Sequence, residues 1–122
     1  MRYSKNGMPV VFVIATDWKL RAAVRAELRE RGIDALGMES ADDAGRMLAQ
    51  GTVPNAMVLE ATAELDGDPA IQRIVTRVPA VLVVSRTETV PLPQVAAVFY
   101  RPVRIAEIVE KVSELLARGQ VA

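Results

Sequence analysis

Val10-Val11-Phe12-Val13-Ile14-Ala15 is the stretch of sequence that decides the fold. Every side chain in it is apolar and most are β-branched, which is typical of a strand buried on both faces. Pro9 comes directly before it, where a missing N–H does least harm to a strand ladder. Doubly buried strands occur mainly in parallel sheets that carry helices on either side. The stretch therefore predicts the first strand of an α/β domain.

Strand and helix patterns alternate from this stretch to the end of the chain. Asp17 can cap a helix in which Leu20, Val24 and Leu28 recur at helical spacing and which ends near Gly32. Further strands are predicted over residues 33–38, 54–60, 81–84 and 96–100, and further helices begin after Ser40, at Pro69 and at Ile105. Strands joined in this way by helices pair in parallel through right-handed crossovers. The pattern predicts a three-layer fold with a five-stranded parallel sheet and helices on both faces.

Composition excludes several kinds of site. The chain has 122 residues, enough for one domain, and its formal net charge is zero. It contains no cysteine and no histidine, so a disulfide, a thiolate nucleophile, a His-based triad and an imidazole metal ligand are all impossible. No apolar run approaches the ~20 residues of a membrane span. We expect a soluble cytoplasmic domain that binds neither membrane nor nucleic acid.

Any ligand of such a sheet should lie at the carboxyl ends of its strands. Acids follow the first and third predicted strands, at Asp17 and Glu60, and the pair Arg101-Pro102 follows the fifth. In these features the sequence resembles response-regulator receiver (CheY-like) domains over about residues 9–118, with residues 1–8 and 119–122 as tails. The resemblance implies a flavodoxin-like/CheY-like sheet with strand order 2-1-3-4-5.

The resemblance also implies where a phosphorylation site would be. In the family, two acids after the first strand hold Mg²⁺ and an aspartate ending the third strand accepts a phosphoryl group. A hydroxyl ending the fourth strand and a lysine after the fifth contact the phosphoryl oxygens. The matching positions here hold Ala15 and Thr16 at the metal-binding acids, Asp17 at a third acid, Glu60 at the phosphoacceptor, Val84 followed by Ser85 at the hydroxyl, and Arg101 at the lysine. We therefore expect no catalytic residue, no metal and no other cofactor.

Glu60 admits three interpretations. It could be a genuine acceptor assisted by Asp17, although Ala15 stands where a metal ligand belongs. It could pair with Arg101, because a guanidinium can hold a carboxylate in two parallel hydrogen bonds and so keep a phosphate-free pocket closed. It could also be a solvated carboxylate without a role. We favour the pair on charge complementarity.

The connection between the fourth and fifth strands is shorter than is usual in the family and contains Pro91 and Pro93. Two prolines so spaced cannot both lie inside a helix, which predicts that the fourth crossover helix is short or missing. Its loss should expose apolar side chains such as Leu92 and Val98. We expect the partner surface here and on the last helix.

Two other features have competing interpretations. Trp18 is either a lid over the first loop or an exposed partner contact. Arg21, Arg25 and Arg29 form a basic ridge, which we interpret as a solvated helix face rather than a nucleic-acid site because few aromatic residues accompany it.

The predicted function is that of an atypical receiver, or pseudo-receiver. It would be a non-enzymatic protein-interaction module of bacterial-type signal transduction or transcriptional control, with a second copy or another signalling protein as partner. The alternatives are a phosphoryl-accepting two-component response regulator with non-standard site residues, and a small-molecule-sensing α/β domain.

Overall fold

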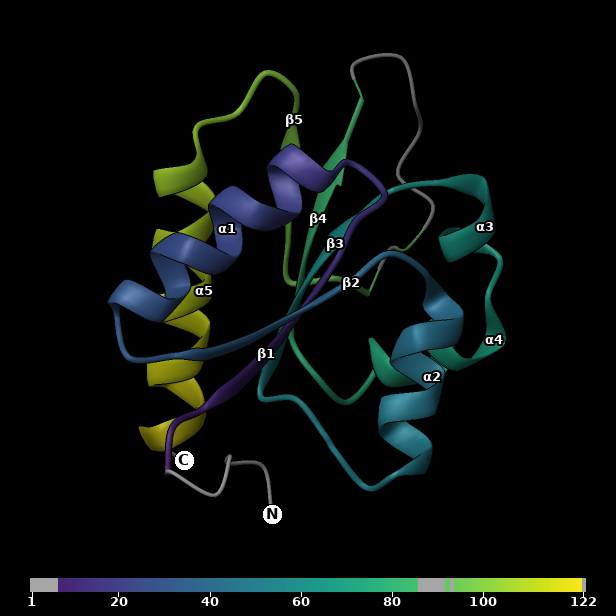
Figure 1. The fold of residues 1–122 in the computed structure, drawn as a ribbon, viewed down its shortest axis with the longest axis horizontal. Helices are drawn as coiled ribbons and strands as arrows, with labels where there is room; N and C mark the ends of the chain where they lie inside the picture. Colours follow the sequence, from purple (N-terminus) through teal and green to yellow (C-terminus); the bar gives the residue numbers. More distant parts are fainter. Residues whose placement is uncertain (1–6, 86–91, 93, 122) are drawn as a thin grey trace.

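A computed structural model describes residues 7–85, 92 and 94–121 of the chain. It contains one five-stranded sheet, in which every pair of neighbouring strands is parallel and the order is β2-β1-β3-β4-β5 (Figure 1). The strands are β1 (Val10–Ile14), β2 (Asp34–Met38), β3 (Ala56–Glu60), β4 (Ala80–Val84) and β5 (Ala97–Tyr100). The helices are α1 (Trp18–Glu30), α2 (Ala41–Ala49), α3 (Ala63–Asp66), α4 (Pro69–Ile74) and α5 (Ile105–Val121). The predicted fold class and strand order are confirmed.

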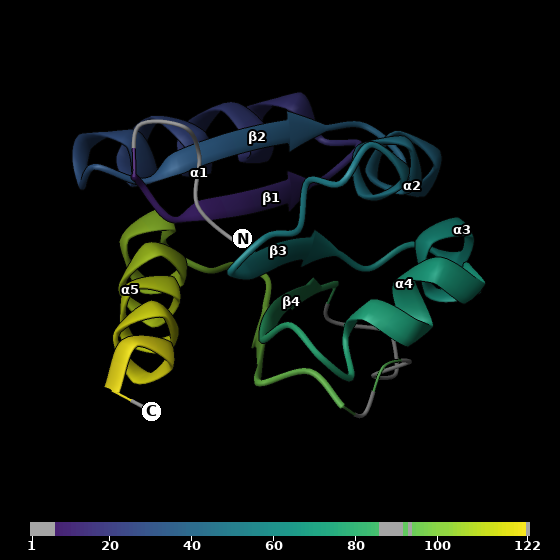
Figure 2. The same ribbon diagram turned by 90° about the horizontal axis from the view of Figure 1, so that it is seen from below.

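Helices cover both faces of the sheet, as Figure 2 shows. The helices α1 and α5 lie on one face, and α2, α3 and α4 lie on the other. Alternate residues of β1 serve the two faces: Phe12 and Ile14 join the apolar cluster under α2 and α4, and Val11 and Val13 join the cluster under α1 and α5. The continuous apolar run that begins at Val10 therefore exists because both sides of this strand are buried.

Helix ends follow the predicted chemistry. The Asp17 carboxylate caps α1 by accepting hydrogen bonds from the N–H groups of Lys19 and Leu20, and Gly32, with φ +77°, turns the chain after this helix. Pro69 occupies the first turn of α4. The short helix α3, capped by Thr62, was not predicted, because four residues carry too little periodicity to be seen in the sequence.

The sequence predicted that the helix between β4 and β5 is short or missing. Pro91 and Pro93 lie outside the described residues, and the described residues 85, 92 and 94–96 are not helical. The expected exposure of Leu92 is wrong, since this side chain is only 3% exposed. It lies in the apolar cluster under α2 and α4, against which Val98 is also packed and half-buried. Leu92 thus covers part of the sheet face that a longer connecting helix would cover.

Two further observations concern the C-terminal helix and the length of the helices. The helix α5 continues to Val121, through residues that the sequence assigned to a C-terminal tail. Within the described ranges, no helix has the length and apolarity needed to cross a bilayer.

Candidate functional site

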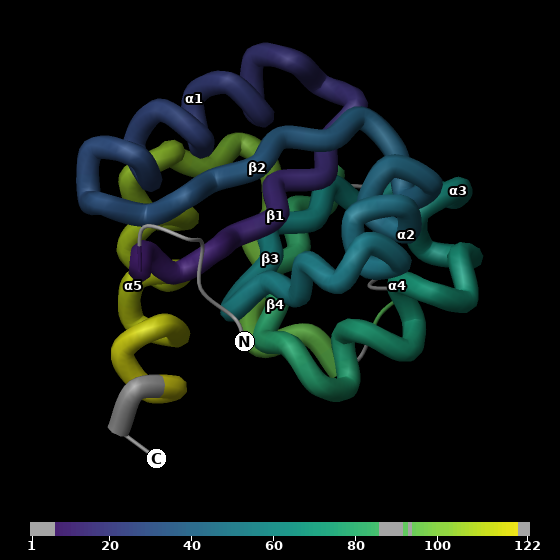
Figure 3. The backbone as a smooth tube through the Cα atoms, turned by 60° about the horizontal axis from the view of Figure 1, so that its bottom comes forward, coloured from purple at the N-terminus to yellow at the C-terminus, as the bar shows by residue number. Residues whose placement is uncertain are grey.

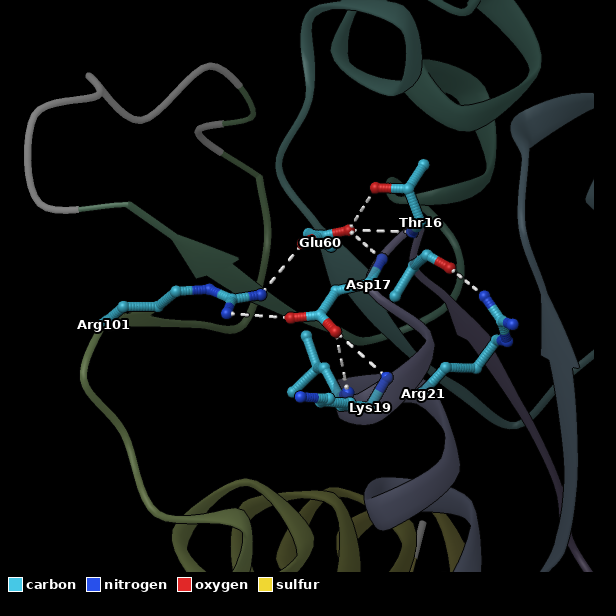
Figure 4. Close-up of polar contacts among 8 residues, drawn as sticks. Thr16, Asp17, Lys19, Arg21, Glu60 and Arg101 are labelled. Atoms are coloured by element: carbon cyan, nitrogen blue, oxygen red, sulfur yellow. Dashed lines mark hydrogen bonds and ion pairs between the residues drawn. The ribbon is translucent and has the colours of Figure 1, made fainter.

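The candidate site lies where the strands end, at the carboxyl edge of the sheet (Figure 4). Thr16 and Asp17 follow β1, Glu60 is the last residue of β3, and Arg101 follows β5. The strands β1 and β3 are neighbours, so the residues that follow β1 lie beside the end of β3. Four residues spread over most of the chain are thereby brought together.

One oxygen of Glu60 is held by the first loop. Glu60 Oε1 accepts hydrogen bonds from Thr16 N and Thr16 Oγ1, each at 2.8 Å, and from Asp17 N at 3.1 Å. These N–H groups come directly before α1, where the free amides and the helix dipole favour a negative charge. The protein therefore uses its own carboxylate to occupy this anion-binding position.

The other oxygen of Glu60 is held by Arg101. The Nη2 atom of Arg101 lies 2.9 Å from Glu60 Oε2, and its Nη1 atom lies 3.2 Å from Asp17 Oδ2. The predicted pairing of Glu60 with Arg101 is thus present, but the two parallel bonds are not. The fork of the guanidinium is divided between two carboxylates, because Asp17 also reaches the cation. The side chain of Glu60 is 14% exposed, and those of Asp17 and Arg101 are each 35% exposed.

Asp17 performs two tasks with its two oxygens. Oδ1 accepts from Lys19 N at 3.0 Å and Leu20 N at 3.3 Å, and Oδ2 meets Arg101. The backbone hydrogen bond from Leu20 and the contacts with Arg101 and Lys19 N outweigh partial desolvation and hold the pKa of Asp17 below its ordinary value of 3.8. Asp17 is therefore an ionised helix cap and the second acid of the Arg101 cluster.

The site does not fit the Mg²⁺ that the resemblance implies. Ala15 brings a buried methyl group to a position where the ion would need a carboxylate, and its carbonyl oxygen accepts from Arg21 Nη1 at 2.6 Å. The carboxylate oxygens of Asp17 and Glu60 already accept hydrogen bonds from Arg101 and from backbone N–H groups. In the part of the chain that the structure describes, no group of three or more carboxylates could hold a metal ion.

The hydroxyl position is split between two neighbouring residues. Val84, the last residue of β4, is fully buried in the apolar cluster under α2 and α4. Ser85 is exposed and lines an open hollow of about 620 Å³ together with Asp17 and Arg101. The side chain that points inward is therefore apolar, and the hydroxyl lies one residue further along.

Thr16 is the functional residue whose part in the site the sequence did not predict. The resemblance marked it only as the place of a lost acid, yet it makes two of the three hydrogen bonds to Glu60 Oε1. No local pattern reports this contact, because the two residues are 44 positions apart. Only the pairing of β1 with β3 brings them together.

The structure also bears on Trp18 and on the basic ridge, whose interpretation as a solvated helix face is wrong for Arg21 and Arg25, since both are half-buried. Trp18 is 63% exposed, so its interpretation as a lid is wrong. In the basic ridge, Arg25 Nε and Arg29 Nη2 donate to Ala35 O, at 3.3 and 3.4 Å. The strand β2 is an edge strand, and these arginines cover part of its unpaired edge. A methyl group on Gly37 of the same strand would come within 2.6 Å of Arg25 Cδ, so a larger residue there would displace the ridge.

Comparison with known proteins bears on the fold. No protein-family model and no curated protein sequence matches the chain. Among solved structures, the chain is similar to a CheY-like response regulator receiver domain protein from Methanospirillum hungatei JF-1, with a TM-score of 0.77, 15% identity, and coverage of 93% of this chain and 98% of that one. It is similar to a response regulator receiver protein from Burkholderia phymatum, with a TM-score of 0.74, 21% identity, and coverage of 89% and 95%. It also resembles a Francisella response regulator receiver domain, with a TM-score of 0.73, 20% identity, and coverage of 91% and 98%. The chain therefore has the CheY-like receiver fold.

Proposed function

We propose that this chain is a pseudo-receiver, a protein-interaction module of bacterial-type signal transduction or transcriptional control that works without phosphorylation. The observation that carries the proposal is the state of Glu60: Oε1 accepts three hydrogen bonds, and Oε2 is paired with Arg101. Both oxygens of Glu60 are therefore already engaged, and an attack by Oε2 on a phosphoryl donor would weaken its ion pair with Arg101.

The surroundings of Glu60 support the same proposal. Phosphoryl transfer depends on cations and donors that neutralise the charge of the incoming group. Here the methyl groups of Ala15 and Val84 replace two such contacts, and the Arg101 guanidinium is already shared by Asp17 and Glu60. A phosphoryl group could enter only by breaking that cluster. The cluster therefore occupies the space that a phosphoryl group would need.

A binding module of this kind needs a partner, either a second copy of the chain or another signalling protein. We place the partner surface at β5, the β4–β5 connection and α5. The strand β5 ends the sheet order, so within the described part of the chain one of its edges has no strand neighbour. Tyr100, at the end of β5, is 50% exposed and is one of two exposed large apolar residues among those described. Tyrosine is enriched at the centres of protein interfaces.

The experiment is incubation of the purified protein with acetyl phosphate and Mg²⁺, followed by intact-mass measurement. We expect no gain of a phosphoryl group on the wild type, and the same oligomeric state with and without the donor. A stable gain of one phosphoryl group that Glu60→Gln abolishes would contradict the proposal. Beryllofluoride, tested by its effect on the melting temperature with and without Mg²⁺, checks the same conclusion without covalent chemistry.

A further inference from the structure

On the face of the sheet away from α1 and α5, the helices α2 and α4 lie side by side (Figure 3), and residues of both helices line a groove. Its volume is about 1130 Å³, whereas pockets for small ligands measure ~300–1,000 Å³. Its apolar lining consists of Leu48 of α2, Val53 of the following loop, Ile74 at the end of α4 and Val78 in the turn after α4. The first three of these side chains remain half-buried. The groove is thus an open apolar surface large enough for a peptide segment.

Among the described residues that line the groove, the charged ones are Arg73 and Arg77, and none is a carboxylate. Both arginines are exposed, and within the described residues neither forms an ion pair, whereas Arg31, Arg46 and Arg104 each pair with an acid. Two cations beside an apolar floor complement a segment that carries acids beside apolar residues.

A glycine that lines the groove gives an independent argument for a binding surface, because a larger side chain at its position would fill part of the groove. Gly45 lies in the middle of α2 and lines the groove. Glycine inside a helix costs about 1 kcal/mol relative to alanine. A Cβ at this position would meet no atom within 4 Å, so the packing of the domain does not require glycine. A longer side chain there would project into the groove.

We infer that this groove is a docking site for an amphipathic helix of a partner protein, with Asp or Glu beside its apolar stripe. The inference rests on the proposed function as an interaction module, but it names a different surface and the chemistry of its occupant. Helices that dock in grooves use apolar anchors at i, i+3 or i+4, and i+7, and the apolar lining of this groove comes from both α2 and α4.

A second copy of the chain does not supply this helix from its described surface. The exposed large apolar residues there are Trp18 and Tyr100. Trp18 begins a helix whose first turn has no acid, and Tyr100 lies on a strand. The helix α5 carries acids, but its apolar residues, such as Ile108 and Val112, are buried against the sheet. The occupant is therefore another protein.

The test is selection of a phage-displayed library of random peptides, each of about 16 residues, long enough to form a helix when bound. We expect enriched sequences with Leu, Ile or Met at helical spacing and with flanking Asp or Glu. Chemical-shift changes caused by a selected peptide should lie on α2, on α4 and on residues 75–78. The Arg73→Glu/Arg77→Glu variant should bind at least tenfold more weakly.

Two further variants sharpen the result. Gly45→Leu should also block binding while preserving or raising the melting temperature, since leucine is the better helix former. Arg104→Glu/Arg118→Glu, with one change directly before α5 and one on it, makes the same change in net charge away from the groove and should bind normally. No enrichment, peptides without acids, or equal loss in the α5 variant would overturn the inference. Peptides that map to β5 and α5 would also overturn it but would support the proposed function, which the phosphorylation test examines separately.

Discussion

Thr16 donates two hydrogen bonds to a single oxygen of Glu60, one from its backbone N–H and one from its hydroxyl, each 2.8 Å long. A metal-binding acid at position 16 would repel the Glu60 carboxylate, whereas a threonine donates to it. On the other side of the carboxylate, Arg101 Nη2 lies 2.9 Å from Glu60 Oε2. The donors of Thr16 and the guanidinium of Arg101 thus stabilise the same carboxylate from two sides.

The hydroxyl of Thr16 should stabilise the fold measurably. Thr16→Val keeps the shape and the backbone N–H but removes one donor to a charged, mostly buried acceptor. We expect unfolding in urea to become easier by about 1 kcal/mol, the usual net value of one hydrogen bond. Thr16→Ser retains the hydroxyl and should remain within about 0.5 kcal/mol of the wild type. Equal losses in both variants would show that the methyl group of Thr16 matters rather than its hydroxyl.

The ion pair between Glu60 and Arg101 can be measured by a double-mutant cycle. Glu60→Gln and Arg101→Met, alone and together, are compared by urea unfolding. Arg101→Met should be the more harmful single change, because it leaves the carboxylates of Asp17 and Glu60 facing each other without a cation. We expect a coupling energy of about 1 kcal/mol or more. Simple additivity would mean that solvent screens the pair and that it holds nothing closed.

Asp17 should make the stability of the domain depend on pH in acid. Its pKa is lowered in the folded state from the ordinary 3.8, first by the backbone hydrogen bond from Leu20 and then by Arg101. A lowered pKa means that the ionised form stabilises the fold above the ordinary pKa, and that this contribution disappears as the pH falls through the folded value. The stability difference between wild type and Asp17→Asn should therefore be constant from pH 7 to 5 and shrink below about pH 4. A difference that grows in acid would contradict this assignment.

The sequence predicted the sheet well because each strand signal was local. The apolar run from Val10 and the capping residue Asp17 act within a few positions, and parallel pairing follows once helices separate the strands. The short helix α3 and the burial of Leu92 were missed for a different reason. Both depend on how a connecting segment packs against one face of the sheet. The hydrophobic periodicity of the sequence does not report such packing.

The candidate site was predictable in its members but not in its bonding. Arg101 and Glu60 could be paired by charge alone, because both follow strands that end at one edge. The division of the guanidinium between Glu60 and Asp17, and the hydrogen bonds from Thr16, depend on contacts of 2.8 to 3.2 Å between residues at the ends of different strands. Such distances arise from strand register, which becomes visible only in the structure.

Magnesium should have almost no effect on this protein. Mg²⁺ demands near-ideal octahedral geometry and gives up its water reluctantly, so it needs carboxylates that are free to bind. Asp17 caps α1 and meets Arg101, and Glu60 is bound on both oxygens, so the ion would have to break an existing cluster. The exposed Trp18 lies next to Asp17 and should report any such rearrangement. We expect millimolar MgCl₂ to leave the fluorescence of Trp18 and the melting temperature at the values found with an equal ionic strength of NaCl.

Arg101→Met is the matched variant, because it releases both carboxylates and should show any latent affinity for Mg²⁺ more strongly than the wild type. Saturable quenching of the wild type with a micromolar midpoint would show that the cluster opens for the metal and that Glu60 is available after all.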